Sequence, residues 1–139
     1  MKRNTDRILT THVGSLIRPP EVRDFLSAIN RGEAINEAAQ TQVLRDAVAQ
    51  VVKQQAQTGI DIVSDGEQFR KHFVHGFLES VNGIDWERMT TMGIRNDRYD
   101  AQVPTVTSKV SRKGSVHGAD AGFCRVHTDR ALKFTLPGP

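Results

Sequence analysis

Gly59-Ile60-Asp61-Ile62-Val63-Ser64-Asp65-Gly66-Glu67 is the stretch that decides the predicted fold. It runs from a glycine that can end a helix, through a short apolar strand, into two carboxylates on either side of Gly66. In parallel α/β folds, ligands bind where strands reach their carboxyl ends, so we expect Asp65 and Glu67 to meet a polar substrate. The sequence also leaves open a tight turn at Asp65-Gly66, with Glu67 capping the helix that follows.

A long amphipathic helix is predicted immediately before this stretch, from about Asn36 to Thr58. Its apolar residues recur at spacings of three and four, which places them on one buried side. They are Val43, Leu44, Ala47, Val48, Val51, Val52 and Ala56. Asn36 is a suitable N-terminal cap, and Gly59 is the expected stop.

A first strand is predicted still earlier, from Arg7 to Thr11, and it leads into the turn His12-Val13-Gly14-Ser15. Gly14 allows a backbone conformation that bulkier residues avoid. Pro20 suits the first turn of a helix covering about Glu21 to Asn30. Strand, helix and strand therefore form the repeating unit, which is typical of a parallel α/β sheet.

After Glu67, the spacing of Phe69, Phe73, Phe77 and Leu78 predicts a second helix over residues 68–78. His72 and His75 lie on it three residues apart, but without a third nearby ligand they do not define a metal site. Residues 84–100 are predicted to be a loop or lid. Residues 103–110 alternate like a half-buried strand, residues 123–126 are expected to pair with it as a hairpin, and a final strand is expected at residues 132–136.

Composition excludes several classes of protein. With 139 residues and 37% hydrophobic content, the chain can form one domain. Its net charge of +3 is spread along the sequence and does not indicate nucleic acid; the basic residues are expected to form a solvated surface, with a polyanion-binding patch as the alternative. They thicken at Lys109, Arg112, Lys113, Arg125, Arg130 and Lys133.

Cys124 is the only cysteine, so neither an internal disulfide nor a zinc site with two cysteines from this chain is possible. We expect it to be a small, half-buried strand residue rather than a reactive thiol. No segment reaches the apolar length of a signal peptide or a membrane span, which together with the cysteine content favours a cytoplasmic protein.

Four segments, in this order, resemble the catalytic barrel of the cobalamin-independent methionine synthase family. They are residues 10–15 (Thr-Thr-His-Val-Gly-Ser), residues 59–67, the strand beginning Val103-Pro104-Thr105-Val106, and the run Lys133-Phe134-Thr135-Leu136-Pro137-Gly138-Pro139. Each motif is weak alone, but their joint order and spacing cover nearly the whole chain and make the resemblance specific.

The resemblance implies a partial (β/α)8 TIM barrel. A complete barrel needs about 250 residues, so residues 1–139 are expected to be a single incomplete domain, the N-terminal half of the barrel. That half would contain about three barrel strands and an inserted β-hairpin. An open half barrel also has unpaired sheet edges, which favour association with other chains.

The resemblance also implies a substrate site. In the family, the backbone of the glycine-serine turn and a glutamate hold the amino acid part of homocysteine, and these positions correspond to Val13, Gly14, Ser15 and Glu67. The chemistry agrees, because an ammonium group favours a carboxylate, and backbone N–H groups with a hydroxyl suit a carboxylate ligand. His12, where the family often has threonine, and Asp65, at the strand end, complete the predicted site.

In the family, a methyl group passes from a methyltetrahydrofolate polyglutamate to a zinc-bound thiolate. The family's zinc ligands and proton-donating histidine correspond to no residue of this sequence, so we predict neither a metal ligand nor a catalytic residue here. An arginine-cysteine pair that contacts folate in the family is replaced by Tyr99-Asp100-Ala101-Gln102, which leaves the donor open. This chain alone is therefore expected to be inactive.

Three alternatives remain. The first is an alkyl transferase acting on another thiol, of the epoxyalkane and coenzyme M type, although Glu67 would repel a sulfonate. The second is a basic binding module, and the third is a half-barrel subunit that a second chain completes. Small-molecule binding without nucleic acid or membrane partners is the leading prediction.

Overall fold

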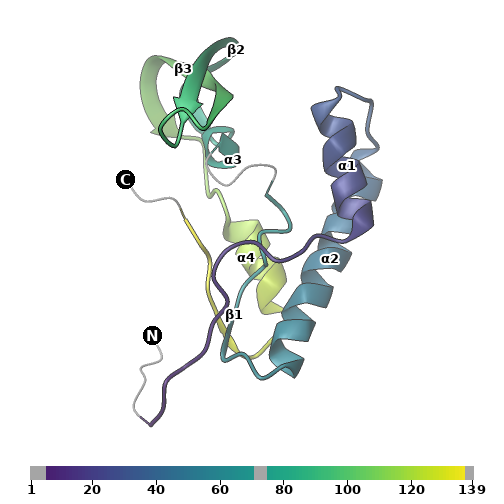
Figure 1. Cartoon of the computed structure of the whole chain (residues 1–139). Helices are drawn as coiled ribbons and strands as arrows, with labels where there is room; N and C mark the ends of the chain where they lie inside the picture. The colour runs from purple at the N-terminus through teal and green to yellow at the C-terminus, as the bar shows by residue number, and fades with distance from the viewer. Residues whose placement is uncertain (1–5, 71–74, 137–139) are drawn as a thin grey trace. The chain divides into compact units, whose positions relative to one another are not determined.

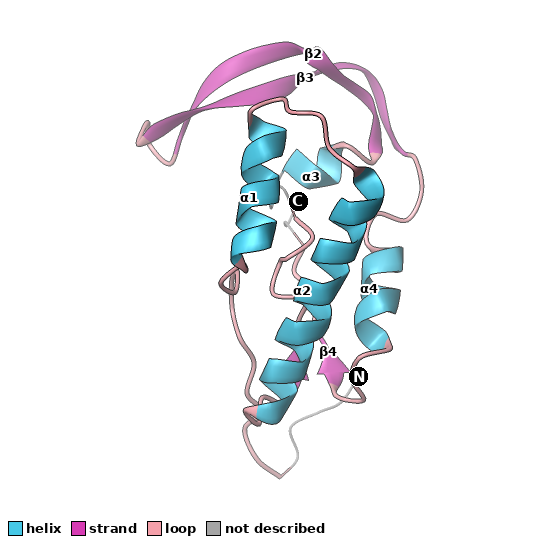
Figure 2. Ribbon diagram, turned by 90° about the vertical axis from the view of Figure 1, so that its right-hand side faces the viewer, coloured by secondary structure: helices cyan, strands magenta, loops and turns pink. Residues whose placement is uncertain are grey.

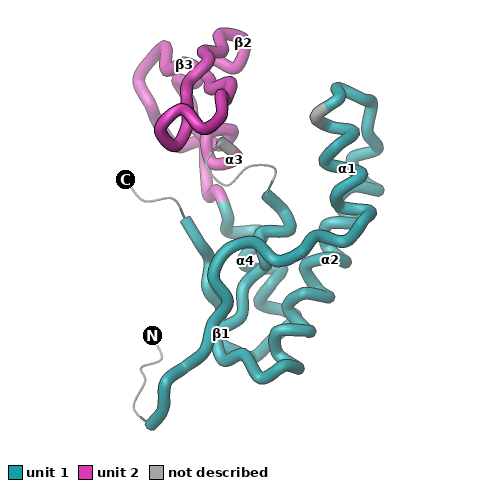
Figure 3. Tube along the Cα trace, viewed as in Figure 1, with its two compact units in different colours: residues 1–71, 117–139 teal, residues 72–116 magenta. Residues whose placement is uncertain are grey.

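The computed structural model describes residues 6–70 and 75–136. The chain forms two compact units, one made of residues 1–71 with 117–139 and the other of residues 72–116 (Figure 3). Figure 1 labels the helices and strands β1 to β3, and Figure 2 labels β4. In the part of the chain described here, no helix combines the length and the apolar character needed to cross a membrane.

The long helix of the first unit, α2, spans Glu37–Gln57 and confirms the predicted amphipathic helix. The Asn36 side chain accepts hydrogen bonds from the backbone N–H groups of Ala38 and Ala39, both at 3.1 Å, and so caps the helix. Its buried residues are Leu44, Ala47, Val48, Val51, Val52 and Gln55, nearly the predicted stripe.

Helix α1 spans Pro20–Asn30, as predicted, with proline in its first turn. Its buried residue Val22 packs against Leu44 and Ala47 of α2. This contact packs α1 against the N-terminal half of α2.

Three short parallel segments lie beside one another in the first unit. β1 (Ile62–Val63) pairs with β4 (Ala131–Leu132), and Thr11 forms an isolated parallel bridge to Ile62. The predicted strands at 7–11, 60–63 and 132–136 are therefore present in shortened form. Figure 2 shows α2 and α4 packed on this sheet, so the unit is a mixed α/β structure.

The core of the first unit joins α2 to β1 and to α4 (Gly118–Arg125). Val48, Val52, Val63 and Cys124 are fully buried in it. The predicted strand at 123–126 is wrong, because these residues belong to α4 and the turn after it. Cys124 is accordingly a fully buried helical residue and not a half-buried strand residue.

The second unit is a long β-hairpin with one short helix, α3 (His75–Leu78). Strand β2 spans Val81–Ile94 and strand β3 spans Tyr99–Arg112, in antiparallel register with Ile94 opposite Tyr99. The predicted strand at 103–110 is thus confirmed, but the loop or lid predicted at 84–100 is wrong. The partner of β3 is β2, and not residues 123–126.

The second helix predicted over residues 68–78 is confirmed only in part. The chain turns at residues 66–69, and among the described residues of this stretch regular helix is present in α3. His72 lies outside the described residues, as does the side chain of His75. The turn has a local cause, because Gly66 and Glu67 both adopt positive φ, which is incompatible with a right-handed helix.

An ion pair attaches the first segment of the chain to β1. The Arg7 guanidinium donates hydrogen bonds to both carboxylate oxygens of Asp61, and the Thr10 backbone N–H donates to the same carboxylate at 2.8 Å. These bonds, with the one from Arg7 contributing most, hold the pKa of the Asp61 carboxyl well below its usual value of 3.8. The charged form of Asp61 therefore stabilises the folded state.

We expect Asp61→Asn to lower the melting temperature at neutral pH, and the difference from the unmodified chain to shrink in acid. The sign follows from the lowered pKa: the contribution is complete above pH 3.8 and is lost as the pH falls through the folded-state pKa. Thermal unfolding followed over pH by circular dichroism measures this. The matched control is Glu33→Gln, which breaks the exposed pair with Arg31 and should change little; equal effects of the two variants would contradict the prediction.

Candidate functional site

The candidate site is built from two loops that follow neighbouring parallel segments. One loop, residues 12–18, follows the bridge at Thr11, and the other, residues 64–70, follows β1. Because the segments are parallel neighbours, both loops leave the sheet at its carboxyl edge. This is the edge at which the sequence predicted the substrate.

A direct hydrogen bond joins the two predicted motifs. The Ser15 hydroxyl donates to the Glu67 carboxylate oxygen Oε2 at 2.9 Å, across 52 positions of sequence. Ser15 is exposed and Glu67 is partly buried, so the pair remains open to a solute. The structure thus brings together a hydroxyl and a carboxylate that the sequence placed on separate loops.

Val13 and Gly14 lie in the same loop as Ser15. Val13 is 82% exposed. Gly14 has a φ of 88°, the left-handed conformation that the predicted turn requires. The expected turn is present.

Asp65 is buried behind this pair, with 2% of its surface exposed. Its Oδ1 atom accepts a hydrogen bond from the Glu67 backbone N–H at 3.1 Å, whereas Oδ2 has no hydrogen-bond partner in the described part of the chain. Burial raises the pKa of the Asp65 carboxyl above its ordinary value, against the opposing effects of the Glu67 amide and the Arg70 guanidinium. Asp65 therefore takes part in a tight turn, which is the alternative that the sequence left open. The Glu67 side chain contacts Ser15 rather than capping a helix.

His12 contributes a half-buried imidazole to the first loop. Its Nε2 atom is buried and makes no hydrogen bond to any residue that the structure describes. Its backbone carbonyl accepts a hydrogen bond from the ammonium group of Lys133, in the segment after β4. The third parallel segment therefore borders the same loop.

The backbone has positive φ at both Gly66 and Glu67, which glycine accepts but which strains Glu67. Gly66 has a φ of 62°, and a β-carbon there would lie 3.1 Å from the Leu16 side chain. Glu67 has a φ of 59° although it is not a glycine, a conformation that costs about 1 to 3 kcal/mol. Such strain persists only where surrounding contacts hold the residue, and it tends to occur at functional sites.

Two polar residues that the sequence did not single out, Arg18 and Gln68, hold the two loops together, and a third, Arg70, binds the second loop to the segment after β4. Arg18 donates to the backbone carbonyls of Glu67 and Arg70, at 3.1 and 2.7 Å. The Gln68 amide donates to the Leu16 carbonyl at 3.3 Å. Arg70 is 8% exposed, and it donates to the Thr135 carbonyl in the segment after β4.

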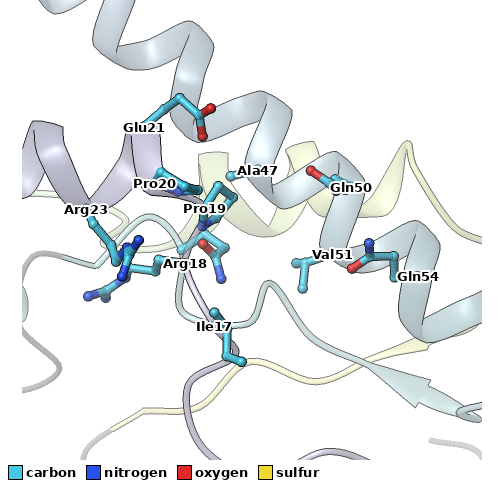
Figure 4. A pocket seen from close by; sticks show the side chains of 11 residues that line it. Ile17, Arg18, Pro19, Pro20, Glu21, Arg23, Ala47, Gln50, Val51 and Gln54 are labelled. Atoms are coloured by element: carbon cyan, nitrogen blue, oxygen red, sulfur yellow. The ribbon is translucent and has the colours of Figure 1, made fainter.

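A pocket of about 580 Å³ lies between α2 and the segment that leads into α1 (Figure 4). Arg18 and Gln68 line it together with Ile17, Pro19, Pro20, Glu21, Arg23, Ala47, Gln50, Val51 and Gln54. None of the six predicted substrate-binding residues is among them. This pocket is therefore distinct from the Ser15–Glu67 pair.

The described residues do not form a metal centre. No group of three or more histidine, cysteine, aspartate or glutamate side chains within them could hold an ion. Cys124 is also unsuited as a thiolate ligand, because burial, followed by the charges of Asp65 and Asp120, raises the pKa of its thiol to about 12. The residues described here do not fit zinc.

Basic residues near the end of the chain donate hydrogen bonds to backbone carbonyls within the fold. Arg125 donates to the carbonyls of Thr128 and Arg130, and Arg130 donates to the carbonyl of Ile60 at 2.8 Å. Lys133 is bound to the loop at residues 12–18. These contacts explain the local excess of positive charge and do not support a polyanion-binding surface there.

Comparison with known proteins shows that the chain is similar to part of several proteins named as methionine synthases or homocysteine methyltransferases. The family model "Cobalamin-independent synthase, Catalytic domain" matches residues 8–139. A methionine synthase of Sulfolobus acidocaldarius is 29% identical over 94% of the chain, and a 5-methyltetrahydropteroyltriglutamate–homocysteine methyltransferase of Acidithiobacillus ferrooxidans is 31% identical over 94%. The chain spans 38% and 16% of the length of these two proteins.

Solved structures agree with the sequence relatives. A B12-independent methionine synthase from Shewanella sp. W3-18-1, in complex with selenomethionine, has a TM-score of 0.74 and 38% identity over 93% of the chain, which spans 37% of that protein. A putative vitamin-B12-independent methionine synthase from Listeria monocytogenes has a TM-score of 0.68 over 94% of the chain. At 19% identity, the second likeness shows a common fold.

Proposed function

This chain belongs to the cobalamin-independent synthase family, within its catalytic domain, and on that premise we propose that it binds the amino acid end of homocysteine in a methyl transfer to the homocysteine thiol. In that transfer, the bond between the methyl group and the donor nitrogen breaks as a bond between sulfur and the methyl group forms. The thiol proton ends on the donor nitrogen, and methionine is the product. The donor proposed is of the folate type, because relatives of the chain are named for a methyltetrahydropteroyltriglutamate donor.

The contact between Ser15 and Glu67 is the observation that carries this proposal. It joins the two loops at 2.9 Å, at the carboxyl edge of the parallel segments. A carboxylate held beside a hydroxyl and a glycine turn offers an acceptor for an ammonium group next to donors for a carboxylate. An α-amino acid carries both of these groups on one carbon.

The roles within the site follow from burial and charge. Glu67 would accept the ammonium group, while the backbone N–H groups of the turn at Val13 and Gly14 and the Ser15 hydroxyl would bind the substrate carboxylate. Asp65 would support Glu67 through its hydrogen bond to the Glu67 amide. His12, which follows Thr11 and has a buried free nitrogen in the described chain, would border the substrate's thiol side.

We propose further that the Thr11 segment, β1 and β4 are three strands of a (β/α)8 barrel. Their parallel order and the packing of helix α2 against β1 support this assignment. In such barrels the site lies at the carboxyl ends of the strands, where residues 12–18 and 64–70 are found. Because zinc does not fit the described residues, no step at a metal is assigned to them.

Ligand binding tests the proposal. The amide NMR spectrum of the chain should shift at Gly14, Ser15 and Glu67 when L-homocysteine or L-methionine is added, because both carry the amino acid group. The deaminated thiol acid with the same carbon chain should cause smaller shifts, and a thiol sulfonate should cause none, because Glu67 repels it. Equal shifts with all four ligands would refute an amino acid site.

A further inference from the structure

One side chain outside the predicted site contacts the strained residue directly. The Nη2 atom of Arg18 donates to the backbone carbonyl of Glu67 at 3.1 Å and to that of Arg70 at 2.7 Å. We propose that Arg18 is a positioning residue, which holds Glu67 in its left-handed conformation and thereby directs the Glu67 carboxylate toward Ser15. The expected effect on amino acid binding rests on the proposed function, whereas the expected effect on the Glu67 conformation does not.

Glu67 needs such a contact because its conformation is intrinsically unfavourable. A residue with a β-carbon at a φ of 59° is held there by its surroundings. Rotation to an ordinary negative φ would redirect both the carbonyl that Arg18 binds and the side chain that Ser15 binds. Both hydrogen bonds, from Arg18 and from Ser15, therefore depend on the same backbone conformation of Glu67.

Other contacts fix the chain around Glu67. The Leu16 backbone N–H donates to the Gly66 carbonyl at 3.1 Å, and the amide of Gln68 donates to the Leu16 carbonyl at 3.3 Å. The Glu67 backbone N–H donates to Asp65 Oδ1 at 3.1 Å, and its carbonyl accepts from the Arg70 N–H at 3.3 Å. Arg18 adds a charged side-chain donor to this carbonyl, the only one among the described residues that reaches it from the other loop.

The chemistry of Arg18 suits this role. A guanidinium group is planar and permanently charged, so it can bridge two carbonyls without exchanging a proton at any working pH. The side chain is half-buried, and its Nε atom has no hydrogen-bond partner within the described residues. Its charge is therefore directed at the backbone of residues 67–70, which places the residue behind the site.

The test uses three variants of the 139-residue chain. Arg18→Met removes the donors and keeps the length of the side chain, and Arg18→Lys restores charged donors. Arg23→Met is the matched control, because Arg23 is exposed and lines the same pocket. Two quantities are measured for each: the intraresidue NOE between HN and Hα of Glu67, which is strong only at positive φ, and the dissociation constant for L-methionine.

We expect Arg18→Met to lose the strong NOE and to bind L-methionine at least about tenfold more weakly. Arg18→Lys should recover both, and Arg23→Met should change neither. A merely structural role would lower the melting temperature of Arg18→Met while the folded variant kept the NOE, and that result would overturn the inference. If Arg18→Met fails to fold, Arg18→Gln, which keeps one donor, is judged by the same two measurements.

The NOE separates this inference from the proposed function. If the unmodified chain binds no amino acid but Arg18→Met loses the NOE, the positioning role stands and the proposed function fails. If the chain binds L-methionine and Arg18→Met binds it equally well with the NOE intact, the proposed function stands and the positioning role is refuted.

Discussion

Gly66→Ala is expected to lower the free energy of unfolding by roughly 2 to 4 kcal/mol. A residue with a β-carbon at the Gly66 φ of 62° costs about 1 to 2 kcal/mol. The added carbon would also lie 3.1 Å from the Leu16 side chain and 3.3 Å from Val51 of α2, and overpacking of this kind costs about 1 to 3 kcal/mol. Chemical denaturation followed by circular dichroism measures the difference.

The matched control for this variant is Gly59→Ala. Gly59 also has a positive φ, of 86°, but nothing lies within 4 Å of the position that its β-carbon would take. The control therefore includes the conformational strain without the clash, and it should lose about 1 kcal/mol. If both variants lose the same free energy, the close approach of residues 64–70 to Leu16 is not a determinant of stability.

Glu67→Gln is expected to weaken binding of L-homocysteine and L-methionine by about ten- to a hundredfold. This range corresponds to about 1.5 to 3 kcal/mol, the usual contribution of a hydrogen bond to a charged group. The amide keeps the length of the side chain and can still contact Ser15, so the loss isolates the negative charge. Titration followed by amide NMR gives both dissociation constants.

Two further variants complete the comparison. Glu67→Asp retains the charge but shortens the side chain that reaches Ser15, so its affinity should fall between those of the unmodified chain and Glu67→Gln. Glu33→Gln removes a carboxylate on the exposed side of the chain, where it pairs with Arg31, and should leave affinity unchanged. Unaltered binding by Glu67→Gln would remove Glu67 from the substrate site.

Features determined by local residue patterns could be predicted from the sequence. The Asn36 cap, the apolar stripe and Gly59 each act within a few residues, and together they specified α2 nearly to its ends. The two loops followed from glycines and carboxylates placed directly after short apolar runs. Their meeting could be predicted because parallel neighbours share an edge.

Strand β2 and helix α4 could not be predicted because their patterns misled. Most of β2 is exposed on both faces, so it lacks the alternation of a half-buried strand. In α4, Gly118 and Gly122 are unfavourable for a helix, yet the helix is stabilised by burial of Cys124 against α2, a contact with a distant part of the sequence. Tertiary packing outweighed local propensity in α4, whereas β2 is formed by its backbone pairing with β3.

The roles of Arg18 and Arg70 could not be predicted from the sequence for a different reason. Arg18 and Arg70 donate to backbone carbonyls, and a carbonyl has no sequence identity that a pattern could match. Gln68 likewise reaches the carbonyl of Leu16. The left-handed conformation of Glu67 depends on contacts of this kind, and the residue type itself does not indicate it.

The insertion of the hairpin between β1 and β4 affects how the chain folds as it leaves the ribosome. Ile62 pairs with Ala131, so the sheet cannot close until the whole hairpin has been synthesised. The hairpin joins near neighbours in sequence and can form within microseconds, whereas translation adds only about 5 to 20 residues per second. For a time on the order of seconds, Val48 and Val52 of the nascent chain therefore lack the cover that Cys124 gives them in the folded unit.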